Sequence, residues 1–446
     1  MKNLSYSAWF LIVLIFLSFS SLGQSTLLQS GPMLGYSEMK EVLLWVQTKK
    51  EVKVKFRYWI KEKPDKKFET KEETSKKENA LVVKAIADEV EPGNKYVYEV
   101  LLNGKSVARP YPLEFQSQKL WRYRTDPPAF TIALGSCNYV ADTAYDRPGK
   151  PYGGNYEIFT SIYNKHPDAM LWMGDNIYLR EADWNTRTGI LYRNTHTRSL
   201  PEMQPLLGSV HNYAILDDHD FGPNDCDRSF FRKDDTFDAF KLFWGNLTYG
   251  VMGEKCATTS FEWGDVQFFL LDDRWFRTPN KRTTGDREIL GKMQMEWLID
   301  ALRTSTSTFK VVAMGGQVIS PLKVYENFAN YENEQNYLIE AIGKEKIEGV
   351  FFLSGDRHQT ELTKKDREGM YPLYDLTVSP LTSSASNIKE DNILRVPDTM
   401  VSERNFATLE FSGPRTDQQV KMSVFNVSGN LLWERTIKAS ELKLPK

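Results

Sequence analysis

Cysteine is scarce in this sequence, with three residues in a chain of 446, and the odd number means that they cannot all pair in disulfides. Neither sign of charge dominates, because 57 Lys and Arg nearly balance 59 Asp and Glu. A protein that coats nucleic acid through non-specific attraction to phosphates is therefore excluded, and we expect no stable nucleic-acid partner. The remaining composition, 41% hydrophobic and 26% charged, is typical of a globular protein and not of a disordered, collagen-like or coiled-coil chain.

The start of the sequence lacks an apolar run of the roughly 20 residues that cross a bilayer. Residues 8–17 form an apolar run of ten, which follows Lys2 and precedes the small residues Ser21 and Gly23. This order is typical of a secretory signal peptide. We predict a Sec-type signal peptide over residues 1–23, secretion or export to the periplasm, and no membrane span in the mature chain. An uncleaved N-terminal anchor is the alternative.

Export would expose the cysteines to an oxidising compartment, which favours disulfides. Cys226 and Cys256 lie 30 residues apart in one loop-rich region and are the candidate pair. Cys137 is then left as a lone thiol, which is either a small buried apolar residue or a metal ligand.

Residues 24–124 have the pattern of a small β-sandwich. Short runs of β-branched and aromatic residues at 42–47, 52–60, 80–87 and 96–102 are separated by turn residues. Pro92 and Gly93, followed by Tyr96 and Tyr98, resemble the tyrosine-corner region of a fibronectin type III-like domain. We therefore predict a fibronectin III-like sandwich over residues 24–124.

From residue 125 onward, short buried strands alternate with amphipathic helices. This pattern predicts an α/β domain over residues 125–446 with more than one sheet layer. The predicted helices are 156–163, 235–244, 293–302 and 332–342. The predicted strands are 130–134, 169–173, 214–216, 266–271, 309–314, 350–353 and 374–378, with a C-terminal hairpin that turns at 428–430.

Several of these strands are followed, at the same end, by polar residues that can bind metal. The five polar segments begin at Ser136, Asp175, Asp217, Asp272 and Asp356. Ligands of open α/β sheets bind beyond the carboxyl ends of the strands. A single acidic residue at a strand end is commonly a helix cap or an ion-pair partner, but five such ends together indicate a site.

The side chains in these segments suit two kinds of cation. A thiolate and a phenolate suit a trivalent or softer transition ion, whereas carboxylate and amide oxygens suit harder ions such as Ca²⁺. The ligands expected for one ion are Cys137, Asp175 and Tyr178, and those for the other are Asp218, Asn224 and Asp356. Asp175 is the expected bridge, and cations are required because so many carboxylates would otherwise repel each other.

In this order the segments resemble the PhoD-like (alkaline phosphatase D) family of the metallophosphoesterase superfamily. The family's Ser-Cys, Gly-Asp-x-x-Tyr and Gly-Asp-x-His motifs correspond to residues 136–137, 174–178 and 355–358. Its Asp-Asp-His-Asp motif and the Asn that follows correspond to residues 217–220 and Asn224, and its Gly-x-x-Gln-x-x-Trp helix to residues 291–297. The resemblance covers nearly the whole chain after the predicted signal peptide.

The resemblance implies a layered α/β/β/α metallophosphatase core and an alkaline phosphatase or phosphodiesterase that acts on a small phosphate ester. It implies that Fe³⁺ is held by Cys137, Asp175, Tyr178 and His358, and that Ca²⁺ is held by Asp175, Asp218, Asn224 and Asp356. A metal-bound hydroxide would then attack phosphorus in line.

Three further residues are expected to act in catalysis. His219 is placed to donate a hydrogen bond to the transition state or a proton to the leaving oxygen, and Asp220 to orient its imidazole. Arg274 is the candidate phosphate clamp. Its alternative role is a salt bridge to one of the neighbouring aspartates at 272 and 273.

Two other functions fit the same residues. One is a phospholipid- or nucleotide-specific phosphodiesterase of the same fold, and the other is a non-catalytic, metal-holding surface-binding protein whose sandwich is the working module. Arg357 stands where the family has a small apolar residue, so it either adds a cation near the site or faces outward. Serine hydrolases and P-loop enzymes are excluded, because the sequence has no Gly-x-Ser-x-Gly elbow and no Walker loop.

Overall fold

The computed structural model describes residues 27–386 and 390–445, so the predicted signal peptide at 1–23 lies outside the described residues. In the described part of the chain, the strands form three sheets of nine, six and six strands. The nine-stranded sheet has the order β21 (Leu431–Lys438), β20 (Gln419–Asn426), β19 (Asn405–Ser412), β10 (Phe130–Gly135), β11 (Ala169–Met173), β12 (His211–Ile215), β1 (Leu28–Ser37), β2 (Val42–Thr48) and β6 (Val82–Ala87).

The second sheet faces the first and carries the other half of the α/β core. Its order is β13 (Thr259–Trp263), β14 (Val266–Leu270), β15 (Phe309–Ala313), β16 (Val350–Ser354), β18 (Leu373–Thr377) and β17 (Glu361–Lys365). The third sheet consists of β4 (Phe68–Glu69), β3 (Lys53–Ile60), β7 (Lys95–Leu102) and β8 (Lys105–Ser106), with β5 (Glu73–Thr74) on β3 and β9 (Glu114–Gln116) on β7.

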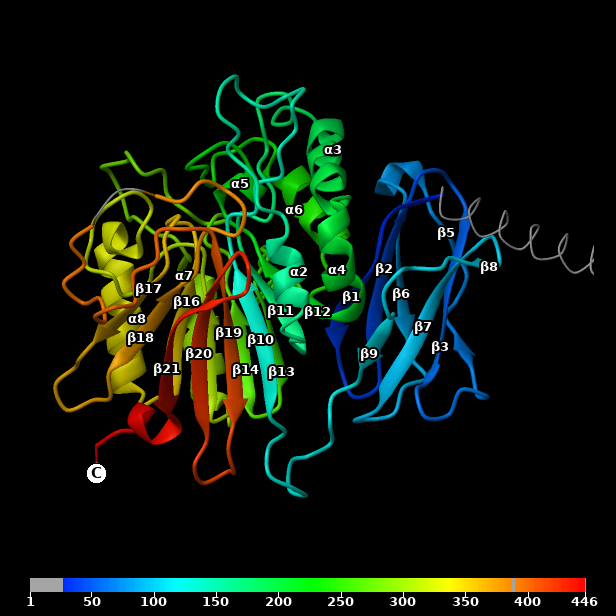
Figure 1. The fold of residues 1–446 in the computed structure, drawn as a ribbon. Helices are drawn as coiled ribbons and strands as arrows, with labels where there is room; N and C mark the ends of the chain where they lie inside the picture. Colours follow the sequence, from blue (N-terminus) through cyan, green and yellow to red (C-terminus); the bar gives the residue numbers. More distant parts are fainter. Residues whose placement is uncertain (1–26, 387–389, 446) are drawn as a thin grey trace, which may run out of the picture.

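The helices lie on the outer faces of the first two sheets (Figure 1). Apolar side chains of α2 (Ile158–Tyr163), α4 (Gln204–Ser209) and α6 (Lys233–Phe243) pack on β11 and β12 of the nine-stranded sheet. Those of α7 (Lys292–Thr304) and α8 (Glu332–Lys344) join the core of the second sheet. The predicted α/β/β/α layering is confirmed, because the largest apolar core combines side chains of both sheets.

Burial explains the local patterns of the strands. All five residues of β11 are buried, because a parallel strand covered on both faces must be apolar throughout. In β3 buried residues alternate with more exposed ones, because only one face of this strand meets a core.

The N-terminal region is a sandwich, and one of its two sheets is shared with the α/β layers. Side chains of β3 and β7 pack against those of β1, β2 and β6. The Tyr96 hydroxyl accepts a hydrogen bond of 2.7 Å from the Glu91 N–H, the contact that defines a tyrosine corner. β1 pairs in parallel with β12, with Leu34 opposite His211, so the nine-stranded sheet continues from the sandwich into the α/β core.

The predicted disulfide between Cys226 and Cys256 is wrong, because both thiols are free in the structure. The Cys256 thiol is buried and donates to Thr258 Oγ1 at 3.3 Å. The Cys226 sulfur packs on the chain at Gly222, where it would lie only 2.6 Å from an added Cβ. Each sulfur is therefore held by its own local packing, and proximity along the sequence did not bring them together.

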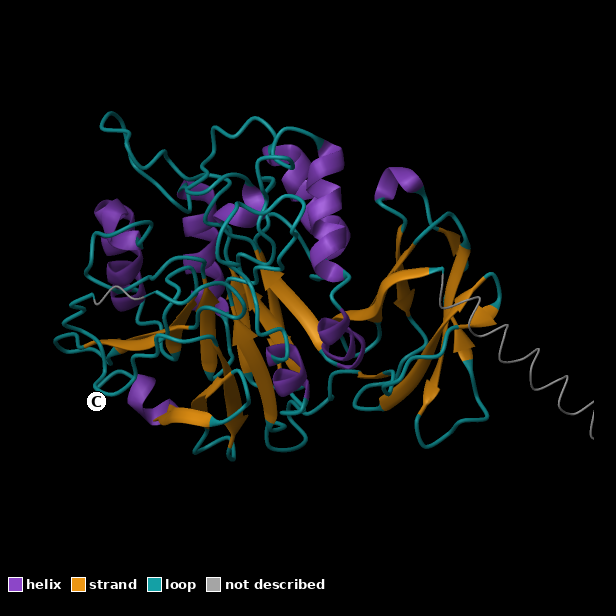
Figure 2. Cartoon of the chain, turned by 45° about the horizontal axis from the view of Figure 1, so that its top comes forward, coloured by secondary structure: helices purple, strands orange, loops and turns teal. Residues whose placement is uncertain are grey.

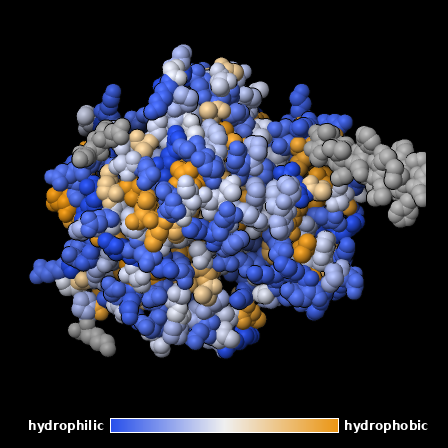
Figure 3. Space-filling view, in the orientation of Figure 1, coloured by the Kyte–Doolittle hydropathy of each residue, from blue (hydrophilic) through white to orange (hydrophobic). Residues whose placement is uncertain are grey.

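Long loops lie over the carboxyl ends of the parallel strands. Figure 2 turns this loop-rich end toward the viewer, and helix α5 (Asp218–Phe221) follows β12 there. The face of the molecule in Figure 3 is mostly hydrophilic, with hydrophobic residues in small separate groups. Within the described residues, no helix combines the length and apolar character needed to cross a bilayer.

Candidate metal centre

Four turns that follow strands of the two facing sheets meet at one place. β10, β11 and β12 are adjacent and parallel, so Cys137, Asp175 and Asp218 emerge from the same edge of the nine-stranded sheet. Asp356 follows β16, a central strand of the facing sheet. The site therefore lies where the carboxyl ends of both sheets come together.

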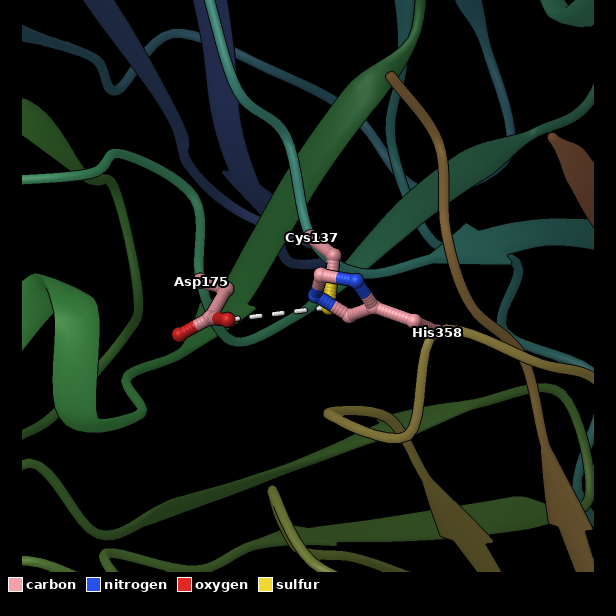
Figure 4. Close-up of side chains that lie close together, drawn as sticks. All are labelled: Cys137, Asp175 and His358. Atoms are coloured by element: carbon pink, nitrogen blue, oxygen red, sulfur yellow. Dashed lines mark hydrogen bonds between the residues drawn. The ribbon is translucent and has the colours of Figure 1, made fainter. Parts of the chain in front are cut away.

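Cys137, Asp175 and His358 point toward one another (Figure 4). Their donor atoms all lie within 4.8 Å of one another, and Cys137 Sγ is 3.6 Å from Asp175 Oδ2. Tyr178 joins the group, because its hydroxyl is 3.3 Å from His358 Nε2. The structure thus brings together all four residues that the resemblance associates with iron.

Asp175 also belongs to a second group, with Asp218 and His219. Asp218 in turn lies with Asp217 and Asp356 in a third group. The carboxylates therefore form a continuous series, and Asp175 stands between the thiol side and the all-oxygen side. Such a position suits a carboxylate that bridges two cations.

Asn224 lies at the edge of the centre and is exposed. Its side-chain amide donates to Asp225 Oδ1 at 2.8 Å, and Asp225 groups with Asp218 and Glu326. The amide is therefore held beside the acidic series but not within its buried part.

The backbone at the centre is strained. Cys137, Asp175, Asp356 and His358 have φ values of 59°, 51°, 62° and 53°, in the left-handed region that residues with a Cβ rarely adopt. Such conformations cost on the order of 1–3 kcal/mol each and cluster at functional sites. Local sequence preference does not explain them, so the tertiary structure holds these side chains in place.

Two glycines of the motifs allow the turns to approach closely. A Cβ on Gly174 would lie 2.6 Å from the Asp217 Cβ, and Gly174 also has a φ of +86°. A Cβ on Gly355 would lie 2.6 Å from the Ser136 side chain. Any larger residue at either position would separate the turns that carry the acidic groups.

Burial and mutual repulsion make these groups difficult to ionise without a cation. Burial, with the charge of Asp356, raises the pKa of the Cys137 thiol to about 11. Burial also raises the pKa of Asp356 to about 6, and burial followed by the charge of Asp218 raises that of Asp175 well above its ordinary value. Nearby positive charge favours the ionised forms of all three groups.

Several buried oxygens of the centre have no hydrogen-bond partner within the described chain, namely Asp217 Oδ2, Asp218 Oδ1 and Asp356 Oδ2. Buried polar atoms are nearly always satisfied by protein, water or ions. The residues present therefore fit a cation site, both in donor chemistry and in unused acceptor capacity.

His219 lies against the centre, whereas Asp220 does not contact its imidazole. The His219 ring packs on the Tyr178 ring with centroids 4.1 Å apart, and its Nε2 is 4.0 Å from Asp218 Oδ2. The Asp220 carboxylate instead accepts hydrogen bonds from the backbone N–H groups of Asn176 at 3.1 Å and Asp217 at 3.0 Å. The predicted orienting role of Asp220 is corrected accordingly: this residue joins the β11 and β12 turns.

The guanidinium of Arg274 is buried among carboxylates, so its predicted role as a phosphate clamp is also corrected. The side chain is fully buried, and its guanidinium forms ion pairs with Asp217, with Glu326 Oε2 at 2.7 Å and with Asp273 at 3.5 Å. Burial alone would lower the pKa of Arg274, but these carboxylates outweigh it and raise the pKa well above the ordinary value. The ion-pair alternative is therefore the one the structure supports, and its strongest partners come from distant loops.

Arg357 is buried and turns partly toward the centre. Its guanidinium pairs with Glu390 and lies 3.8 Å from Asp356 Oδ2. It therefore neutralises part of the acidic series, and it does not face outward.

Several residues that shape the centre were not predicted from the sequence. Ser379 donates to Cys137 Sγ at 3.1 Å and accepts from the His358 N–H at 3.0 Å, so it joins two candidate ligands. Tyr152 contacts His358 Nδ1 at 3.2 Å, and Glu326 reaches the acidic series from the loop before α8. None of these three lies in a recognisable motif, although Asp217 and Asp225 could have been inferred from their neighbours in the sequence.

A cleft of about 430 Å³ opens beside the centre. Tyr178, His219 and Asn224 line this cleft, together with Tyr152 and other residues of its loop. The cleft gives a small molecule access to the candidate metal-binding side chains.

Sequence comparisons identify two regions of the chain. Residues 251–423 match a family described as PhoD-like phosphatase, and residues 25–120 match a domain of unknown function. Alkaline phosphatase D of Bacillus subtilis (strain 168) is 22% identical over 341 residues, which cover 64% of this chain and 54% of that protein. The chain thus spans about half the length of the curated relative that it matches.

Structural comparisons agree with the predicted fold. A solved structure of PhoD superposes with a TM-score of 0.74 at 16% identity and covers 92% of both chains. The purple acid phosphatase PPD1 from yellow lupin (Lupinus luteus) seeds superposes with a TM-score of 0.66 at 12% identity, over 92% of this chain and 74% of that one. At these identities the likeness concerns the fold alone, and it confirms the metallophosphatase type of fold.

Proposed function

This chain belongs to the PhoD-like family, and on that premise we propose that it is an exported, metal-dependent hydrolase of small phosphate mono- or diesters. The observation that carries the proposal is the position of Asp175 between two donor groups. Cys137 and His358 lie on one side of it, and Asp218 and His219 lie on the other. A metal pair that shares one carboxylate is a suitable arrangement for attack on phosphorus.

We propose Fe³⁺ and Ca²⁺ as the ions. The residues that would hold Fe³⁺ are Cys137, Asp175, Tyr178 and His358, and those that would hold Ca²⁺ are Asp175, Asp218, Asn224 and Asp356. A thiol and a phenol suit the first ion, and an all-oxygen set suits the second. When bound, the ions would acidify a water molecule and neutralise the phosphoryl oxygens.

His219 is the side chain best placed to handle a proton. Its ring lines the cleft, and Asp218 lies 4.0 Å from Nε2. Burial lowers the pKa of His219, which favours the neutral imidazole with a single N–H. That N–H would donate to the leaving oxygen of an ester bound in the cleft.

The experiment combines elemental analysis with two assays. Protein purified without chelator should contain iron and calcium and should hydrolyse p-nitrophenyl phosphate, bis(p-nitrophenyl) phosphate or both. The Asp175→Asn variant should lose both ions and more than 100-fold in kcat/KM. Asp366→Asn, a change at an exposed aspartate paired with Lys364, is the matched control and should leave both unchanged.

A protein that holds the ions but hydrolyses neither ester would contradict the proposal and favour the surface-binding alternative. EGTA should abolish hydrolysis, and added Ca²⁺ should restore it. Indifference to both treatments would exclude calcium from the reaction.

We also propose that residues 1–23 are removed on export and that residues 24–124 and 125–446 are the sandwich and the hydrolase regions. The sequence pattern supports the first part, and the separate apolar core of the sandwich supports the second. N-terminal sequencing of the exported protein should begin near residue 24. A retained leader would contradict the cleavage.

A further inference from the structure

Because Arg274 is occupied by buried carboxylates, an anionic substrate in the cleft must meet another cation. The cleft beside the metal centre is lined by three basic side chains, Arg147, Lys150 and Arg180. Arg147 is already paired with Glu181 at 2.6 Å, and Lys150 lies on the exposed outer loop. Arg180 is therefore the remaining basic residue of the cleft that could receive an anion.

Arg180 lies two residues after Tyr178, on a turn with a rigid backbone. Its N–H donates to Asp183 Oδ2 at 2.9 Å, and its carbonyl oxygen accepts from the Asp183 N–H at 2.7 Å. The same carboxylate oxygen of Asp183 accepts from Arg193 Nε at 2.8 Å and is buried. The side chain of Arg180 therefore projects from a fixed point on the cleft wall.

The guanidinium of Arg180 has no carboxylate partner within ion-pair distance in the described ranges. Its contact is with the face of the Tyr139 ring, 5.1 Å from the ring centroid, and its Nε is buried without a hydrogen-bond partner there. In contrast, the neighbouring Arg193 pairs with Asp183 and Asp142, and Arg274 pairs with three carboxylates. A half-buried arginine with unused donors beside a cleft is ready to receive an anion.

Arg180 shares the cleft with the groups at the metal centre. Its side chain lines the same cleft of about 430 Å³ as Tyr178 and His219. A small molecule bound in that cleft can therefore meet both Arg180 and His219.

We propose that Arg180 is the residue that binds the phosphoryl oxygens of the substrate, and of the phosphate product, in the cleft. This inference rests on the proposed function, since it names the group that holds the substrate of that site. The guanidinium contributes charge-assisted hydrogen bonds that grow stronger as negative charge develops on the oxygens. The ring of Tyr139 stacks against the guanidinium and limits its motion.

The test uses the full-length mature protein with its metals and three variants. Arg180→Ala should lower kcat/KM for p-nitrophenyl phosphate by about 100-fold, the scale of loss for one preorganised donor. It should also weaken the binding of inorganic phosphate, measured by calorimetry, more than 10-fold. Arg180→Lys should recover part of both quantities, because it restores the charge but not the two-pronged geometry.

Arg187→Ala is the matched control. This arginine lies seven residues further along, 3.9 Å from Asp235, and does not line the cleft. Arg187→Ala removes the same charge from the same region but not from the cleft. The kcat/KM and the affinity for inorganic phosphate should therefore stay within twofold of the wild type.

Three outcomes would overturn the inference. They are an Arg180→Ala variant with wild-type kcat/KM and wild-type phosphate binding, loss of bound metal in that variant, and an equal effect of Arg187→Ala. The phosphate measurement separates this inference from the proposed function, because it requires no turnover. A wild-type protein that binds phosphate through Arg180 but hydrolyses no ester would uphold the inference and refute the proposed function.

Discussion

Replacing Arg274 with Met is the change that most clearly separates a structural arginine from one that binds substrate. Arg274 is completely buried, and its guanidinium neutralises Asp217 and shares Glu326 with Arg277. After the substitution Glu326 keeps Arg277 at 3.0 Å, whereas Asp217 and Asp273 lose the one cation that lies within ion-pair distance of them among the described residues. Both then become uncompensated buried carboxylates, and Asp217 loses the closer partner.

The expected loss of stability follows mainly from Asp217, whose ion pair with Arg274 is the closer of the two. Removal of one partner from a buried ion pair costs about 3–5 kcal/mol. This is a large part of the roughly 5–15 kcal/mol by which native proteins are stable. Asp217 also caps α5, which carries Asp218 and His219, so the damage should extend to the proposed metal ligand and the proposed proton donor.

Urea unfolding followed by tryptophan fluorescence measures this loss, since the chain has 11 tryptophans. Adding Asp217→Asn to Arg274→Met should recover at least about 1 kcal/mol, because it removes one of the two uncompensated charges. The control is Arg122→Met, whose exposed partner is Glu262 at 3.3 Å, and it should cost less than about 1 kcal/mol. If Arg274→Met unfolds within about 1 kcal/mol of the wild type and yet loses hydrolysis, Arg274 binds substrate and the structural reasoning is refuted.

Three further predictions concern single side chains. Cys137→Ser should lose the proposed iron ion and any visible absorption band that it gives, because a neutral hydroxyl is a poorer donor than a thiolate; full iron content measured by elemental analysis would contradict the assignment. His219→Ala should lower kcat by about 100-fold or more while the metal content stays within twofold, and an unchanged kcat would remove this residue from the reaction. Burial lowers the pKa of His211 to about 4, so as the pH falls the unfolded chain is protonated at this residue before the folded chain is. Protonation therefore favours unfolding, and the protein loses stability as the pH falls from 6.5 to 4. The free energy of unfolding should drop by about 3 kcal/mol over that interval through this residue, and urea midpoints should show a smaller drop for His211→Gln; an equal drop in both proteins would refute the linkage.

Much of the fold could be predicted because burial leaves a local record in the sequence. β11 and β16 are continuous apolar runs, and α7 and α8 have apolar residues at helical spacing, so their existence follows from the residues themselves. The prediction did not include α3 (Arg187–Arg198), because its buried residues include Arg193, Asn194 and Arg198. Their burial depends on ion pairs and hydrogen bonds to other segments, which no periodic pattern reveals.

Part of the candidate site could likewise be predicted from the sequence, and part of it could not. The motifs alone placed Cys137, Asp175 and His358 at the ends of strands, and the parallel arrangement of those strands made their meeting foreseeable. The sequence could not identify the partners of Arg274, because Asp217 and Glu326 are separated from it by 57 and 52 residues. Nor could it identify Arg180 as the arginine without a carboxylate partner in the described cleft. A sequence records which residues prefer burial, strands or turns, but the pairing of charges depends on where distant loops come together, and only the tertiary structure decides that.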